Sequence, residues 1–254
     1  MKKKLILACL LIVLCHFMSM TVASASAVNP IPDISIDIGN SESGQPGTTS
    51  LSIILLITII SIAPALLMLM TSFTRIVIVL GFVRTSLGTQ QMPPNQVLVG
   101  LALFLTLFIM APTFSTMNDT ALQPYLKGEL NQAEALDKAQ EPIKTFMFTH
   151  TREKDLLLFM KYTGMEKPNN HQEIPLNVLV PAFAISELKT AFQMGFMIFI
   201  PFLIIDIIVA STLMAMGMMM LPPVMISLPF KILLFVLVDG WYLVVKSLLL
   251  SFNT

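Results

Sequence analysis

Residues 51–70 read LSIILLITIISIAPALLMLM and decide the class of fold. They carry no charge over 20 residues, and a helix of about that length crosses the roughly 30 Å of hydrocarbon in a bilayer. Backbone polar groups in lipid must pair within their own segment, which favours a helix over an open strand. Three more apolar segments follow, at 97–112, 191–213 and 226–250. We therefore predict an all-α membrane protein.

The overall composition agrees with a membrane protein. Of the 254 residues, 55% are hydrophobic and 12% are charged, and the mean hydropathy is +0.81, whereas an average soluble chain is about 25% charged. The 15 basic and 15 acidic residues give a net charge of zero. This balance does not provide the basic face that nucleic acid requires, so we expect no nucleic-acid partner.

Residues 1–25 have the pattern of a bacterial secretory signal peptide. Lysines at 2–4 precede an apolar run at 5–17, and small residues at 23–25 and 25–27 offer two cleavage sites. An uncleaved anchor helix is the alternative. Cleavage would leave a chain without cysteine, and therefore without a disulfide or a thiolate metal site.

The rest of the chain divides by its charge and apolar pattern. Residues 26–50 are rich in proline, glycine and acids, which predicts a flexible periplasmic tail. We predict a first apolar helical hairpin at 51–114, a small helical periplasmic domain at 115–185, and a second apolar hairpin at 186–254. Prolines remove a helical hydrogen bond and are expected to kink these hairpins. They are Pro64, Pro201 and Pro229.

The signal peptide also predicts the topology in the bacterial inner membrane. Cleavage leaves the N-terminus outside, so the first apolar segment enters, the second leaves, and the charged domain lies in the periplasm. The third and fourth segments then form an inward hairpin around 214–224. Arg75 and Arg84 are expected in the first internal loop. The basic residues of the charged domain do not conflict with this, because loops longer than about 60 residues escape the positive-inside rule.

No enzyme motif occurs in the sequence. We find no phosphate-binding loop, no nucleophile elbow, no zinc-protease helix and no pair of histidines at metal-ligand spacing. We therefore predict no catalysis, no cofactor and no metal.

Four ionisable residues lie within or beside the apolar segments and need partners. They are Glu187, Asp206, Lys231 and Asp239. A charge at the centre of a spanning helix costs about 2.5–3.5 kcal/mol on insertion scales, so each side chain should face protein or water. We interpret them as structural charge pairs that fix helix register between subunits, and we expect Glu187 to pair with Lys231. A proton or ion relay is the alternative.

A methionine cluster before Leu221-Pro222-Pro223 is the least ordinary feature. Five methionines fall within seven residues: Met214, Met216, Met218, Met219 and Met220. Methionine is unbranched, flexible and polarizable, so a ring of such side chains could close a pore and still yield to a passing chain. Gly217, before the last three, permits a close approach or a bend. Packing at a helix end is the alternative to such a gasket.

Several strings resemble the FliP family of flagellar biosynthetic proteins. They are TSFTRI at 71–76, QQMPPNQ at 90–96, PAFAISELKTAFQMGF at 181–196, PFLIID through MAMGM at 201–218, and VLVDGW at 236–241. The resemblance extends from about residue 50 to the end of the chain.

This resemblance implies a core subunit of the flagellar type III protein export gate in the basal body. Such proteins form a homo-oligomeric ring, which we expect to be a pentamer, together with the subunits FliQ and FliR. The ring-like channel conducts unfolded rod, hook and filament proteins, and its helices form a cone largely above the bilayer plane. In this family the methionine loop lines the constriction. The corresponding residues here are Met218, Met219 and Met220, supported by Met214, Met216 and Gly217.

Three alternatives stay open at this point. The paralogue in virulence injectisomes resembles this chain over the same segments, although the signal peptide and Leu221-Pro222-Pro223 favour the flagellar branch. A proton-coupled transporter would place Asp206 in a midplane site, but no hydropathy repeat relates 51–112 to 191–250. A structural anchor without a conduit would tolerate any apolar residue in place of the methionines.

Overall fold

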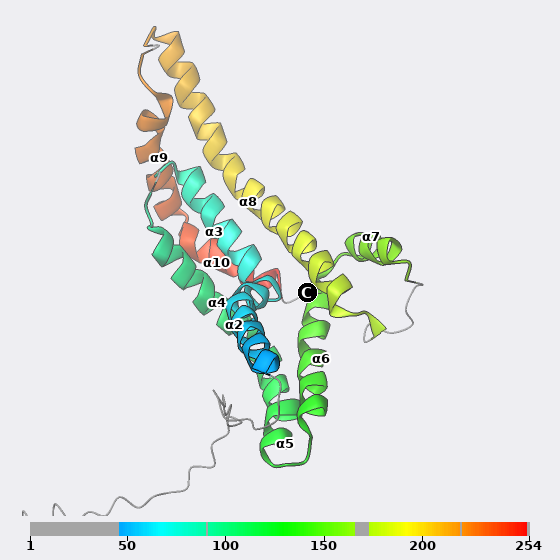
Figure 1. Cartoon of the computed structure of the whole chain (residues 1–254). Coiled ribbons are helices and arrows are strands. Elements are labelled where there is room, and N and C mark those ends of the chain that lie inside the picture. Colours follow the sequence, from blue (N-terminus) through cyan, green and yellow to red (C-terminus); the bar gives the residue numbers. More distant parts are fainter. Residues whose placement is uncertain (1–45, 90, 166–172, 219, 253–254) are drawn as a thin grey trace, which may run out of the picture. The chain divides into compact units, whose positions relative to one another are not determined.

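The computed structural model describes residues 46–89, 91–165, 173–218 and 220–252, and every regular element in those ranges is a helix (Figure 1). The all-α prediction is therefore confirmed for the described residues. The chain divides into two units, Met1–Thr49 and Ser50–Thr254. In the first unit only the start of one helix is described, and the predicted signal peptide lies outside the described residues.

The helices follow one another with short connections. Their bounds are α2 Pro46–Leu69, α3 Phe73–Leu87, α4 Asn95–Met117, the π-helical turn η1 Asn118–Leu122, α5 Gln123–Leu126, α6 Gln132–His150, α7 Glu153–Thr163, α8 Leu176–Ala215, α9 Pro223–Leu237 and α10 Gly240–Leu250. α2 thus begins inside the segment predicted as a tail, and α8 continues across the boundary predicted at residue 185.

Two helices of the described chain are long and apolar enough to cross a membrane, the continuous helix Asn95–Leu126 and α8. Up to four spans occur if each of two bent pairs counts as one. α2 and α3 meet at 67°, and α9 and α10 meet at 62°. The fourth apolar segment is therefore not the single helix that the sequence predicts, because Asp239 adopts a left-handed backbone with φ of 51° and breaks it.

α3 lies within the segment that the sequence predicts as the first internal connection, and most of that segment is helical. One face of α3 is apolar, and its side chains are 0% to 6% exposed: Ile76, Val79, Leu80, Val83 and Leu87. Their spacing of three and four residues is that of a helix with one buried face. The two arginines conceal this pattern, since Arg75 lies on the buried side and Arg84 donates a hydrogen bond to Asn95.

α8 is the helix on which α3, α6, α7 and α9 pack. The approach of α3 is close, because a Cβ on Gly195 would lie 2.4 Å from the ring of Phe82, so only glycine fits there. Two clusters of buried side chains lie along α8. One joins α8 to α3, α4 and the C-terminal helices around Leu80, and the other joins α8 to α6 and α7 around Phe183.

α6 and α7 are the main helices of the charged region between the apolar hairpins. Asn131 and Glu134 exchange side-chain-to-backbone hydrogen bonds at the start of α6, which satisfies two free N–H groups of that helix. Ser186 fixes α7 to α8. Its hydroxyl donates to Asp155 Oδ2 at 2.7 Å and accepts from the N–H of Arg152 at 3.1 Å.

Candidate functional site

The methionine loop, residues 214–220, joins the end of α8 to α9 (Figure 1). It begins with a turn in which the Met218 N–H donates to the Leu213 carbonyl and the Gly217 N–H donates to the Met214 carbonyl, both at 3.0 Å. This is the hydrogen-bond pattern of a Schellman helix end. Gly217 has φ of 74°, which a residue with a Cβ rarely adopts, so the bend predicted at this glycine is confirmed.

The described side chains of the methionine loop are not covered by the rest of the chain. At the described positions they are well exposed: Met214 63%, Met216 62%, Met218 39% and Met220 98%. Met219 lies outside the described residues. Because the core residues Met110 and Met147 are 0% exposed, the loop methionines differ from those that fill the core. An exposed apolar cluster is typical of a surface that lipid or another chain covers.

An ion pair joins the two helices that carry this loop. Lys231 Nζ on α9 lies 2.5 Å from Asp206 Oδ2 on α8, and Ser227 Oγ donates to Asp206 Oδ1 at 2.5 Å. The Lys231 side chain is 4% exposed and that of Asp206 is 24% exposed. A Cβ on Gly88, just beyond α3, would lie 3.8 Å from Lys231 Nζ. The ammonium therefore has a carboxylate and the negative end of a helix dipole beside it.

A second ion pair fixes α3 to α8. Arg75 forms two hydrogen bonds with Glu187, of which Nε to Oε2 is 2.8 Å long, and the two side chains are 4% and 0% exposed. Arg75 Nη1 also donates to the carbonyl and the hydroxyl of Ser251 at 2.9 Å. The guanidinium carbon lies 3.8 Å from the centre of the Phe252 ring, within cation–π distance. This pair connects α3 and α8 with the C-terminal residues.

The pairing of Glu187 with Lys231, expected from the sequence, is wrong. Asp206, the true partner of Lys231, lies about 28 Å from Glu187 along α8 at 1.5 Å per residue. The sequence places Arg75 in the connection between the first two apolar segments, and therefore does not indicate it as the partner of Glu187. The sequence nevertheless indicates that Arg75 has an acidic partner, because an arginine alone on an apolar helix face requires one.

Asp239, the fourth ionisable residue singled out in the sequence, has a different setting. It is exposed at the break between α9 and α10 and forms no ion pair with any residue that the structure describes. A partner for it in a neighbouring copy stays a prediction.

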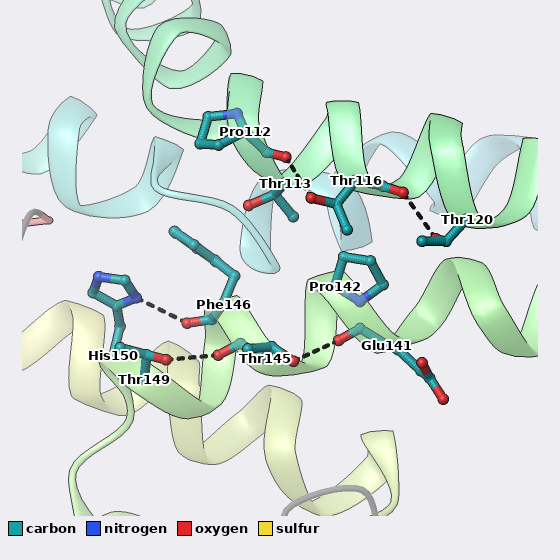
Figure 2. Close-up of a pocket in the computed structure, with 10 residues that line it drawn as sticks. All are labelled: Pro112, Thr113, Thr116, Thr120, Glu141, Pro142, Thr145, Phe146, Thr149 and His150. Carbon is teal, nitrogen blue, oxygen red and sulfur yellow. Dashed lines mark hydrogen bonds between the residues drawn. The ribbon is translucent and has the colours of Figure 1, made fainter.

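A pocket of about 440 Å³ lies among threonines of α4, η1 and α6, and Figure 2 shows the residues that line it. Four of its hydroxyls donate to the carbonyl four residues earlier at 2.8–3.0 Å: those of Thr116, Thr120, Thr145 and Thr149. Their protons are used within the helices, so none of these hydroxyls is activated as a nucleophile. In the described ranges, no group of three His, Cys, Asp or Glu side chains could hold a metal ion.

Comparison with known proteins relates most of the chain to one family. The model of the FliP family matches residues 56–248. The flagellar biosynthetic protein FliP of Bacillus subtilis (strain 168) is 68% identical over 217 residues, which cover 85% of this chain and 98% of that protein. The protein of the same name from Pectobacterium carotovorum subsp. carotovorum is 52% identical over 82% of this chain and 81% of its own length. The one from Caulobacter vibrioides is 46% identical over 100% of this chain and 92% of its own.

Proposed function

Because the chain belongs to the FliP family of flagellar biosynthetic proteins, we propose that it is a core subunit of the channel in the flagellar export apparatus. Several copies, expected to be five, form a ring with FliQ and FliR in the bacterial inner membrane at the basal body. The ring conducts unfolded rod, hook and filament proteins. The methionine loops of neighbouring copies meet at the constriction and close it between export events.

The observation that carries this proposal is the exposure of the methionine loop. Four of its side chains are 39% to 98% exposed at a tight helix end, where this chain alone does not cover them. Thioether side chains are deformable and do not require hydrogen bonds, so neighbouring copies can pack them against one another in many arrangements. An apolar constriction excludes water and ions by dewetting. Such a seal would close around a passing chain and close again after it.

Two local features support a loop that is held in place, as a seal requires. The Schellman turn defines the direction in which the chain leaves α8. About 12 Å further back along α8, by helical rise, Asp206 joins α8 to Lys231 of α9. The two legs of the hairpin are thus bound together close to the methionines, which supports a loop held in place.

The alternatives have less support. A transporter would need Asp206 available for a substrate or proton, whereas its two carboxylate oxygens are bonded to Ser227 and Lys231. The relatives with 46% to 68% identity are flagellar proteins, which favours the flagellar branch over the virulence injectisome. A structural anchor without a conduit gives no reason for an exposed methionine cluster.

The test replaces Met218, Met219 and Met220 together by alanine in the complete export apparatus. Ion leak across the membrane during export is then measured. Alanine leaves the positions apolar but removes the bulk that fills the constriction, so the leak should rise several-fold. Met92→Ala is the matched control, because Met92 is 65% exposed outside the loop and its replacement should change nothing. An unchanged leak in a loop variant that assembles normally contradicts the proposal.

A further inference from the structure

We propose that the pocket between α4, η1 and α6 binds a primary ammonium group, carried by a lysine side chain of a neighbouring chain or by a free amine. Its volume of about 440 Å³ is that of pockets that hold organic ligands, so it has room for more than a bare ion. Such a site is separate from the methionine loop and does not depend on the proposed channel.

Threonines line the pocket on two walls (Figure 2). Thr116 at the end of α4 and Thr120 in η1 are four residues apart, and so are Thr145 and Thr149 on α6. Residues four apart lie on the same face of a helix. Each wall therefore carries a row of hydroxyl groups.

These hydroxyl groups can accept hydrogen bonds from a ligand but have no proton left to donate. Each of the four donates to the carbonyl four residues earlier at 2.8–3.0 Å. A threonine hydroxyl has one proton and two lone pairs, so only its lone pairs stay available. A ligand that matches several acceptors must bring several donors, and a primary ammonium brings three.

The other lining residues also favour a cation over an anion. Glu141 supplies an acidic group, and no lysine or arginine is among the lining residues that the structure describes. His150 Nδ1 lies 2.8 Å from the Phe146 carbonyl, which can only accept, so Nδ1 is the donor and Nε2 is an acceptor in the neutral ring. The Phe146 ring extends from α6 towards α4 (Figure 2), and an aromatic face attracts a cation.

The first measurement uses a lysine analogue and the purified full-length chain in detergent. Nα-acetyl-lysine methylamide should raise the melting temperature in a saturable way, because a ligand that binds only the folded chain stabilises it. The analogue with a trimethylated side-chain nitrogen has the same charge but no N–H donor. It should bind on the order of tenfold more weakly, because hydrogen bonds to charged groups are strong. A lysine analogue without effect, or two analogues with equal affinity, overturns the proposal.

The second measurement compares variants of the pocket. Thr145→Val with Thr149→Val keeps the shape of both side chains but removes two acceptors, and should raise the dissociation constant of the lysine analogue on the order of tenfold or more. Serine at both positions keeps the oxygens and should bind like the wild type.

Thr163→Val is the matched control for these variants. Thr163 is an exposed threonine of α7, outside the pocket, whose hydroxyl also donates to carbonyls of its own helix. The affinity of this control should equal that of the wild type. Wild-type affinity in the double valine variant overturns the proposal. If that variant does not fold, the comparison of the two analogues on the wild type still decides.

Cross-linking in the complete export apparatus identifies the source of the amine. Thr149→Cys provides a thiol at the pocket, and replacing Cys9 and Cys15 by serine removes the other thiols of the chain. A short reagent that joins a thiol to an amine should then link this position to a lysine of a neighbouring chain, whereas Thr163→Cys should give no such link. If no link forms although the lysine analogue binds the purified chain, the ligand is a free amine. Failure of the analogue to bind overturns both sources.

Discussion

Replacing Asp206 by asparagine should destabilise the hairpin of α8 and α9 more than replacing Lys231 by methionine. Asparagine keeps an oxygen that accepts from Ser227 but removes the charge beside Lys231, whose side chain is 4% exposed. Removal of one partner from a buried ion pair costs about 3–5 kcal/mol. Because Asp206 is 24% exposed and water reaches it, we expect the lower value, about 3 kcal/mol. Lys231→Met leaves the more hydrated partner and should cost less.

Thermal unfolding of the purified full-length chain in detergent measures this difference. A loss of about 3 kcal/mol corresponds to a decrease of about 6–12 °C in the melting temperature of a chain of this size. The double variant with Asp206→Asn and Lys231→Met carries neither charge. Its melting temperature should return most of the way to the wild-type value, because a buried ion pair contributes little more than apolar side chains of similar size.

The double variant decides whether the unpaired ammonium is the cause. If it is no more stable than Asp206→Asn alone, the loss has another origin and the reasoning is refuted. A proton relay through Asp206 would give a different result. In that case Asp206→Asn would keep the wild-type melting temperature and assemble in normal amounts, and only the dependence of export on the proton gradient would disappear.

Two further substitutions test the packing on α8. Glu187→Gln leaves Arg75 buried without its carboxylate and should lower the free energy of unfolding by about 3–5 kcal/mol. The amount of protease-resistant chain in membranes should then fall sharply, and adding Arg75→Met should restore part of it. No recovery in the double variant would contradict the pairing. Gly195→Ala places a Cβ 2.4 Å from the Phe82 ring and should lower stability by about 1–3 kcal/mol. Phe82→Leu should restore part of the melting temperature, and an alanine variant as stable as the wild type would show that the close contact adjusts freely.

The apolar helices could be predicted from sequence because a long charge-free run has few other structures in lipid. The residues at which these helices end were harder to predict. The sequence suggests that the second segment ends at Pro112, yet α4 continues to Met117 with this proline inside it. A proline inside a spanning helix is tolerated where neighbouring groups satisfy the freed carbonyl. The break at Asp239 is indicated by the adjacent Gly240, since Asp-Gly pairs favour turns.

α3 and the ion pairs were not predictable in the same way. Arg75 and Arg84 suggest a loop if charge alone is considered, while the periodicity of the apolar residues between them indicates a helix. Partner choice depends on which helices lie side by side, and that information is not local. The turn at Gly217 could be predicted from the sequence, because a glycine after a helical run is a common helix end. The gate function assigned to the methionines stays a prediction.

The two ion pairs set the positions of the helices on α8 in a way that apolar contacts do not. Burial of apolar surface is non-directional. A slip of α3 or α9 by one helical turn, about 5.4 Å, would therefore keep much of the apolar surface buried. The same slip would separate Arg75 from Glu187, or Lys231 from Asp206, and leave charges without partners at a cost of about 3–5 kcal/mol. The second pair joins the two helices, α8 and α9, between which the methionine loop lies. These charges therefore act on position more than on net stability, which gives a physical reason for charged side chains within apolar helices.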